Sequence, residues 1–302
     1  MNREVVFGTT FECVGDLMLS TKHTSDVDSQ TIFSFACYTA MNSERFGRED
    51  YLKYFDSAAY LKTFQSDIKG SEMEGDLMPW KMKSFHDVFA EGKLTGRRLL
   101  DIGTGPTIHT VISASNCCDT IYLSDLVPQN RETLRKWLEG TLQHNFKSFF
   151  QYVVDREGKG TSWTHREDEL RTKIGGILPI DLLEEDPMAP CYFPRFDIVT
   201  TSLCLDSVVL DHVDYGHAAR KITNLVKTGG FLIVFGLYGA STYTVGEHVF
   251  RSCHVTTGEV KDAWTHCGFD IVDWREQKNM ENTENTVSNF EGFFLMTAKR
   301  VR

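Results

Sequence analysis

Two glycines after a short apolar stretch could form a ligand-binding turn. Gly103 and Gly105 follow the stretch 98–102 and precede Pro106 and Thr107. Because glycine has no side chain and adopts left-handed backbone conformations, such a turn lets a ligand approach the backbone closely. A helix beginning near Thr107 would add its positive end, which favours an anion or a carboxylate. The spacing therefore predicts a site for the charged part of a cofactor.

The same turn suits two classes of cofactor. A dinucleotide would place its pyrophosphate there, and S-adenosylmethionine would place the carboxylate of its amino-acid end there. The dinucleotide fingerprint carries a third glycine three residues after the second, where this chain has Ile108. This departure disfavours an NAD-dependent oxidoreductase, and S-adenosylmethionine is the cofactor that we expect.

Two acidic residues could contact the nucleoside part of either cofactor. Asp125 ends the second apolar stretch, where a carboxylate can accept hydrogen bonds from both ribose hydroxyls. Asp181 follows the stretch 176–180 and could meet an adenine amino group. The alternative for both is an acidic residue that simply faces solvent. The acidic run 184–186 close behind supports this alternative for Asp181.

Alternating apolar and amphipathic segments must position these residues. Strands buried on both faces are predicted at 98–102, 120–124, 196–201 and 230–235, with helices at about 107–115, 128–143, 165–174 and 212–226. This alternation predicts an α/β protein with a Rossmann-like, mostly parallel sheet. A capping box at Thr256 and Glu259 begins a further helix, and late strands at 271–274 and 292–298 could close the sheet in antiparallel fashion.

The chain before Arg97 has two parts. Residues 1–48 are polar and weakly patterned, so we expect an N-terminal extension, disordered or loosely docked. Aromatic residues then recur at three- and four-residue intervals, which predicts a helical cap over 49–96. The catalytic domain would span 49–302.

Composition narrows the partners and the compartment. The net charge of −10 and the absence of a basic run disfavour a nucleic-acid or anionic-membrane partner. Eight scattered cysteines fit neither a disulfide framework nor a metal site, and no apolar stretch approaches a membrane span. We expect a cytoplasmic monomer without a bound metal.

Several blocks of the sequence resemble the small-molecule N-methyltransferases that act on nicotinamide, phenylethanolamine, indolethylamine and thioethers. The blocks include Gly103-Thr-Gly-Pro-Thr107, Leu203-Cys-Leu-Asp206 and Tyr243-Thr-Val-Gly-Glu247, and the likeness covers about 250 residues. The resemblance implies a seven-stranded class I methyltransferase fold and a methyl transfer from S-adenosylmethionine to a small amine or pyridine.

The resemblance also implies positions for the ligands. Residues around S-adenosylmethionine would be Tyr60, Gly103, Thr107, Asp125, Asn130, Asp181, the backbone of Leu182, and Ser202. The acceptor pocket would be lined by Phe64, Tyr243 and Ser252, although ordinary packing is an alternative for Phe64.

Four positions depart from the family pattern. Gly236 stands where nicotinamide-specific members have an aspartate, and Ala240 replaces a polar residue, which leaves the acceptor open. Gln65 and His109 stand where tyrosines are usual and alter the rim of the cofactor site. A protein that binds S-adenosylmethionine without methylating an amine is therefore the alternative function.

The chemistry requires little of the side chains. Methyl transfer from a sulfonium is an in-line displacement, so approximation and desolvation can suffice and no catalytic residue is required. A primary or secondary amine must also lose a proton, and His248 or Glu247 could assist, with a solvated turn as the alternative for both.

Overall fold

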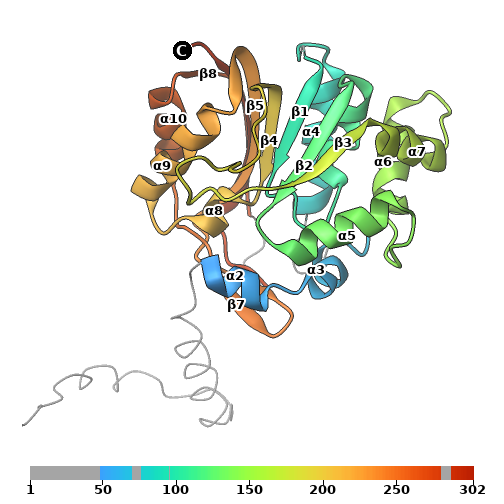
Figure 1. Cartoon of the computed structure of the whole chain (residues 1–302), viewed down its shortest axis with the longest axis horizontal. Helices are drawn as coiled ribbons and strands as arrows, with labels where there is room; N and C mark the ends of the chain where they lie inside the picture. The colour runs from blue at the N-terminus through green and yellow to red at the C-terminus, as the bar shows by residue number, and fades with distance from the viewer. Residues whose placement is uncertain (1–47, 70–75, 95, 280–286) are drawn as a thin grey trace, which may run out of the picture. The chain divides into compact units, whose positions relative to one another are not determined.

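The computed structural model describes residues 48–69, 76–94, 96–279 and 287–302 (Figure 1). The extension predicted over 1–48 lies outside these residues except for Arg48, which begins helix α2 (Arg48–Tyr54). Within the described part of the chain, no helix is long and apolar enough to cross a membrane.

A seven-stranded sheet organises the fold, in the order β3-β2-β1-β4-β5-β9-β8. Only β9 runs antiparallel to its neighbours, β5 and β8, while the other pairings are parallel. This confirms the predicted sheet and its antiparallel closure. The strands are β1 (Arg98–Ile102), β2 (Thr120–Asp125), β3 (Ile174–Pro179), β4 (Phe196–Ser202), β5 (Val226–Tyr238), β8 (Phe269–Lys278) and β9 (Gly292–Arg300).

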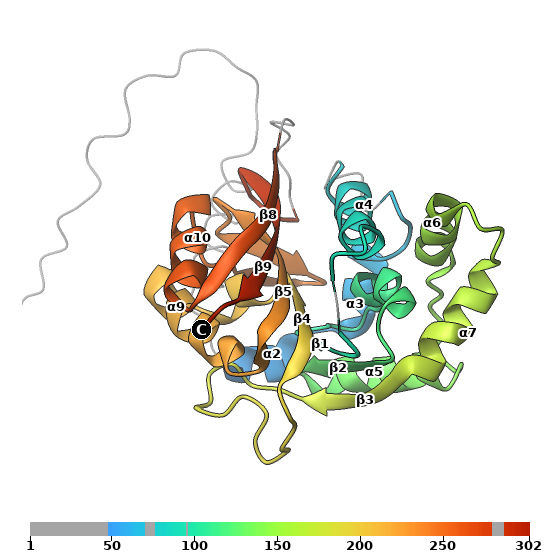
Figure 2. The ribbon, with the colours of Figure 1, turned by 90° about the horizontal axis from the view of Figure 1, so that it is seen from above.

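Helices cover both faces of the sheet, which is why its central strands are apolar on both sides (Figure 2). One face packs against α4 (Leu77–Ala90), α5 (Pro128–Leu138), α6 (Lys147–Glu157) and α7 (Trp163–Lys173). The other packs against α8 (Leu205–Val208), α9 (His212–Thr223) and α10 (Thr257–His266). The predicted capping box of Thr256 and Glu259 is present at the start of α10.

Some predicted boundaries were wrong. The helix expected at 107–115 is two 3₁₀ turns, η2 (His109–Val111) and η3 (Ser113–Asn116), because a run of β-branched and hydroxyl side chains disfavours an α-helix there. The helix expected at 128–143 ends at Leu138, close to Gly140, whose φ is +74°. Helix α6 and strand β3 were not predicted.

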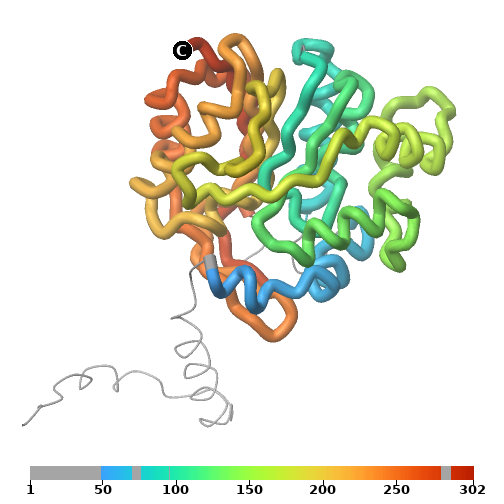
Figure 3. The backbone as a smooth tube through the Cα atoms, in the orientation of Figure 1, coloured from blue at the N-terminus to red at the C-terminus, as the bar shows by residue number. Residues whose placement is uncertain are grey.

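An aromatic cluster joins two segments that are far apart in the sequence. Helices α2 and α3 (Ser57–Phe64) lie beside the hairpin of β6 (Thr242–Val245) and β7 (His248–Arg251) (Figure 3). The ring of Tyr51 lies 5.0 Å from that of Phe250, which stacks on Tyr243 at 5.5 Å. Helices α2 and α3, in the stretch predicted as a helical cap, therefore pack on a hairpin that was not predicted, whereas α4 in the same stretch packs against the sheet.

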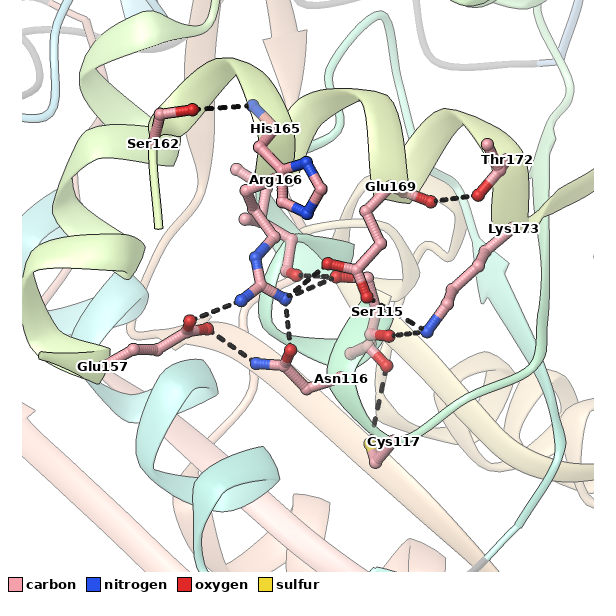
Figure 4. Close-up of polar contacts among 12 residues, drawn as sticks. Ser115, Asn116, Cys117, Glu157, Ser162, His165, Arg166, Glu169, Thr172 and Lys173 are labelled. Atoms are coloured by element: carbon pink, nitrogen blue, oxygen red, sulfur yellow. Dashed lines mark hydrogen bonds and ion pairs between the residues drawn. The ribbon is translucent and has the colours of Figure 1, made fainter. Parts of the chain in front are cut away.

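A buried polar network fixes α7 against α6 and η3 (Figure 4). The guanidinium of Arg166 pairs with Glu157 and, at 3.2 Å, with Glu169. It also donates to Asn116 and Ser115, and the Arg166 and Glu157 side chains are each 4% exposed. Charges buried here are neutralised inside the protein.

Candidate active site

A cavity lies at the carboxyl ends of β1, β2 and β4 and extends to α2, α3 and the β6–β7 hairpin. Strands lead into tight turns at this edge of the sheet, so polar residues that follow buried strands converge there. The structure brings every predicted site residue to the cavity: Tyr60, Phe64, Gly103, Thr107, Asp125, Asn130, Asp181, Leu182, Ser202, Tyr243 and Ser252.

The glycine turn has the close packing that its sequence indicated. Gly103 and Gly105 have φ values of +65° and +66°, in the left-handed region that favours glycine. A Cβ on Gly103 would lie 2.2 Å from the sulfur of Cys204, so no side chain fits. The backbone N–H of Gly105 donates to Asp125 at 2.7 Å, which ties the turn to the end of β2.

Asp125 is buried and held by neutral donors. Besides Gly105, it accepts from the Val127 N–H at 2.8 Å and from the Asn130 amide at 3.0 Å. A carboxylate has about four acceptor positions, so roughly one remains for a ligand hydroxyl. Burial raises the pKa of Asp125, and the three hydrogen bonds oppose that rise. Helix α5 sets Asn130 in place, and Ser57 of α3 donates to the same amide at 2.7 Å.

A second buried carboxylate, Asp101, lies beneath the turn and was assigned no role from the sequence. It accepts from the hydroxyls of Thr110, at 3.2 Å, and Thr200. Burial raises its pKa to about 6. Asp101 lines the cavity although it is buried. The spacing of the motif alone does not indicate this position.

After the glycine turn, the polar groups at the cavity belong to side chains and not to the N-terminus of an α-helix. Since residues 109–116 form only 3₁₀ turns, the expected α-helix dipole near Thr107 is absent, and that part of the prediction was wrong. Thr107 and His109 line the cavity instead, 2.8 Å apart from hydroxyl oxygen to ring Nδ1.

The cavity also contains an acidic group that was assigned no role from the sequence. Asp206, in α8, lines the cavity beside Ser252, whose hydroxyl donates to its carboxylate at 3.3 Å. Burial raises the pKa of Asp206 to about 6. It stands in the Leu203–Asp206 block that carried the resemblance, so its place in the sequence was a usable signal.

A lysine was also missed. Lys81 of α4 lines the cavity although it is only 1% exposed, and its ammonium lies 5.1 Å from the centre of the Phe235 ring. The surrounding helix is mainly apolar, and nothing in its spacing separates this lysine from the solvated ones.

Gly236 and Ala240, which depart from the family pattern, do not change the lining of the cavity. Neither residue lines it, and a Cβ on Gly236 would lie 2.8 Å from the ring of Phe294, which belongs to the core on the other face of the sheet. Ala240 is buried in the core that contains α4. The candidate proton acceptors His248 and Glu247 do not line the cavity either.

Comparison with known proteins identifies this arrangement. The family model described as the NNMT/PNMT/TEMT family matches residues 43–301, which is more than four fifths of the chain. The chain belongs to the NNMT/PNMT/TEMT family. Membership confirms the resemblance drawn from the Gly103–Thr107, Leu203–Asp206 and Tyr243–Glu247 blocks, and with it the expected class of enzyme, an S-adenosylmethionine-dependent methyltransferase.

Curated relatives within the family agree over most of their length. The chain is 31% identical to phenylethanolamine N-methyltransferase of Macaca mulatta, over 82% of this chain and 89% of the relative. It is 29% identical to nicotinamide N-methyltransferase of Homo sapiens, over 86% and 98%. Indolethylamine N-methyltransferase of Oryctolagus cuniculus is 31% identical, over 74% and 86%.

A solved structure supports the fold. Magnesium protoporphyrin IX methyltransferase from Synechocystis PCC 6803, with bound S-adenosylhomocysteine, superposes with a TM-score of 0.50 over 87% of this chain and 99% of that one. At 12% identity this likeness concerns only the fold, and it confirms the predicted class I methyltransferase architecture of the family.

Proposed function

We propose that this protein transfers a methyl group from S-adenosylmethionine to the nitrogen of a small aralkylamine. One observation carries the choice of an amine: the buried carboxylate of Asp206 shares a cavity with the residues assigned to the cofactor. A buried carboxylate that faces a cavity favours a cationic partner. The relatives named for phenylethanolamine and indolethylamine support the same class of acceptor.

The cofactor would occupy the part of the cavity between the glycine turn and Asp181. The carboxylate of Asp125 has an acceptor position left for a ribose hydroxyl, and the N–H of Gly105 holds this carboxylate in place. Asp181, with the backbone of Leu182, would contact the adenine, and Tyr60, Thr107, Asn130 and Ser202 would enclose the remainder. When bound there, S-adenosylmethionine supplies the methyl group on its sulfonium.

The acceptor would lie between aromatic walls. Phe64 is buried, and its ring centre lies 4.9 Å from that of Tyr60. Tyr243 reaches the cavity from the hairpin, and Ser252 with Asp206 forms the polar end. This combination suits a flat ring that carries a charged amine.

Asp206 can bind the amine and take its proton. A small alkylamine arrives as an ammonium, which has no lone pair for attack. A carboxylate with a pKa of about 6 is ionised at neutral pH, so it can pair with this ammonium and accept one of its protons, which frees the nitrogen lone pair that then attacks the methyl group. Holding the nitrogen in line, away from water, supplies the rest of the catalysis.

Two alternatives have less support. Nicotinamide attacks through a ring nitrogen that has no proton to lose, so it does not need a proton acceptor at this position, although a relative bears its name. The reading as a binding protein without an acceptor site rested on Gly236 and Ala240, which lie outside the cavity lining.

The part of the chain that catalysis needs, its oligomeric state and its compartment belong to the same proposal. We propose that residues 49–302 suffice for catalysis, that the protein acts as a monomer in the cytoplasm, and that it has no nucleic-acid partner. A chain that begins at Glu49 should retain full activity, and analytical ultracentrifugation should give the mass of one chain.

A methyl-transfer panel tests the acceptor. Purified protein is incubated with isotopically labelled S-adenosylmethionine and one of phenylethylamine, tryptamine, nicotinamide, quinoline or a thioether, and products are identified by mass spectrometry. We expect methylation of the two amines. Methylation confined to nicotinamide, quinoline or the thioether, or cofactor binding with no product, would contradict the proposal.

A further inference from the structure

A chain of hydrogen bonds connects the end of α3 to the cavity. The hydroxyl of Thr107 donates to the side-chain oxygen of Gln65 at 3.1 Å, and the same hydroxyl oxygen lies 2.8 Å from Nδ1 of His109. All three side chains are buried, and Gln65 is 0% exposed. Gln65 therefore acts on the cavity only through Thr107 and His109, which line it.

With the side-chain oxygen of Gln65 facing Thr107, as the structure has it, the direction of these bonds sets the protonation of the imidazole. A hydroxyl has a single proton, and that of Thr107 is given to Gln65. The bond between Thr107 and His109 then requires a proton on Nδ1 of the ring. A neutral His109 must consequently carry a lone pair, not a proton, on Nε2.

That nitrogen has no partner in the described part of the chain. Nε2 of His109 is buried and forms no hydrogen bond there, although an unsatisfied buried polar atom is costly. Burial, together with the nearby charge of Lys81, holds the pKa of His109 well below its usual value, so the ring stays neutral. His109 lines the cavity, so its ring carries an acceptor in need of a donor beside this site.

We propose that His109 Nε2 accepts a hydrogen bond from the α-ammonium of S-adenosylmethionine, and that Gln65, through Thr107, is the positioning residue that sets this tautomer. The proposal rests on the proposed function, which supplies a ligand with an ammonium at one end. The carboxylate of Asp101, bonded to Thr110 one residue along, favours a cation in this part of the cavity. The ligand's own carboxylate offsets the repulsion from Lys81.

Ligands that differ only at the amino-acid end test the contact. Dissociation constants are measured by calorimetry for S-adenosylhomocysteine, its deaminated analogue, its decarboxylated analogue, and 5′-methylthioadenosine, which lacks the whole amino-acid end. Each is titrated into the wild-type chain, His109→Phe, Gln65→Met and, as a matched control, Gln151→Met on α6 outside the cavity lining.

We expect His109→Phe and Gln65→Met each to weaken S-adenosylhomocysteine and its decarboxylated analogue roughly 10- to 100-fold, as for loss of a hydrogen bond to a charged group. The deaminated analogue and 5′-methylthioadenosine should bind all variants equally, which also shows that the variants fold. Gln151→Met should change nothing.

Other outcomes separate the possible failures. Equal losses for every ligand would overturn the contact in favour of a structural role, and a loss that follows the carboxylate would reverse the tautomer. If 5′-methylthioadenosine and S-adenosylhomocysteine both fail to bind the wild type, the proposed function is wrong rather than this contact alone.

The ring itself reports the role of Gln65. Nitrogen-15 NMR distinguishes the protonated from the unprotonated imidazole nitrogen. The ligand-free wild type should carry the proton on Nδ1, and Gln65→Met should move it to Nε2, because Thr107 can then donate to the ring. The same tautomer in both proteins would overturn the relay.

Discussion

Two regions of this molecule bury charged groups in opposite ways. Between α6, α7 and η3, the charges of Arg166 and Glu157 neutralise one another (Figure 4). In the cavity, the carboxylates of Asp101, Asp125 and Asp206 are held by hydroxyl, amide and backbone N–H donors. In the first arrangement each buried charge has an oppositely charged partner within the protein.

The difference separates a structural network from a binding site. Burial raises the pKa values of the three cavity carboxylates, which means that their ionised forms lack full compensation. Such groups cost stability in the free protein and gain partners when a ligand binds. Charge variants in the two regions should therefore have different consequences, stability in one and binding or catalysis in the other.

The largest effect is expected from Arg166→Ala. Removing the guanidinium leaves Glu157 buried without a cation, which should lower the free energy of unfolding by about 3 to 5 kcal/mol. Urea unfolding measures the loss, and S-adenosylhomocysteine affinity of the folded protein should not change. The double variant Arg166→Met, Glu157→Leu should recover most of the stability; an equally unstable double variant would mean that packing, not charge, is responsible.

Asp125→Ala should weaken the binding of the cofactor rather than lower the stability of the fold. Losing charge-assisted hydrogen bonds to the ribose and to the glycine turn should weaken S-adenosylhomocysteine roughly 100-fold in calorimetry. Asp119→Ala, at the exposed residue just before the same strand, is the matched control and should bind normally. Unchanged affinity in Asp125→Ala would remove this residue from the cofactor site.

Asp206→Asn should impair turnover while leaving the cofactor in place. We expect kcat/KM for an aralkylamine to fall by about 100-fold, within the range for loss of a positioned proton acceptor. S-adenosylhomocysteine affinity should equal that of the wild type. Asp214→Asn, on the exposed side of α9, serves as the control. Wild-type turnover in Asp206→Asn would refute its role with the amine.

The smallest expected effect is a pH-dependent difference in the free energy of unfolding, and the sign of this difference follows directly from the raised pKa. Asp206 has a pKa raised from 3.8 to about 6, so its ionisation destabilises the free protein as pH rises through that interval. Asp206→Asn should then be more stable than wild type at pH 7.5, by about 1 to 3 kcal/mol, with no difference below pH ~4.

Asp197 provides the opposite case. Its hydrogen bonds to Lys227 and to the N–H groups of Arg97 and Arg98 lower its pKa. Its contribution to stability is therefore present at neutral pH and is lost as pH falls through the lowered pKa, so Asp197→Asn should be less stable than wild type at pH 7.5. The same sign for both variants would mean that the ionised carboxylate of Asp206 is fully compensated in the free protein.

How far the sequence predicted these features depends on the range of the interactions. Gly103 and Asp125 were found because each follows a buried strand, and strand ends meet at one edge of a parallel sheet. Lys81 was missed because its burial depends on packing between elements that are distant in the sequence, whereas Asp206 stands in a block of the resemblance that could have marked it. The helix near Thr107 was wrong because local side-chain hydrogen bonds compete with helical ones.

The central claim is that the cavity with uncompensated carboxylates is the cofactor site. Titration calorimetry of the wild-type chain with S-adenosylhomocysteine, and separately with NAD, tests it most directly. The account predicts one molecule of S-adenosylhomocysteine bound per chain and no binding of NAD. Binding of NAD without binding of S-adenosylhomocysteine would contradict it.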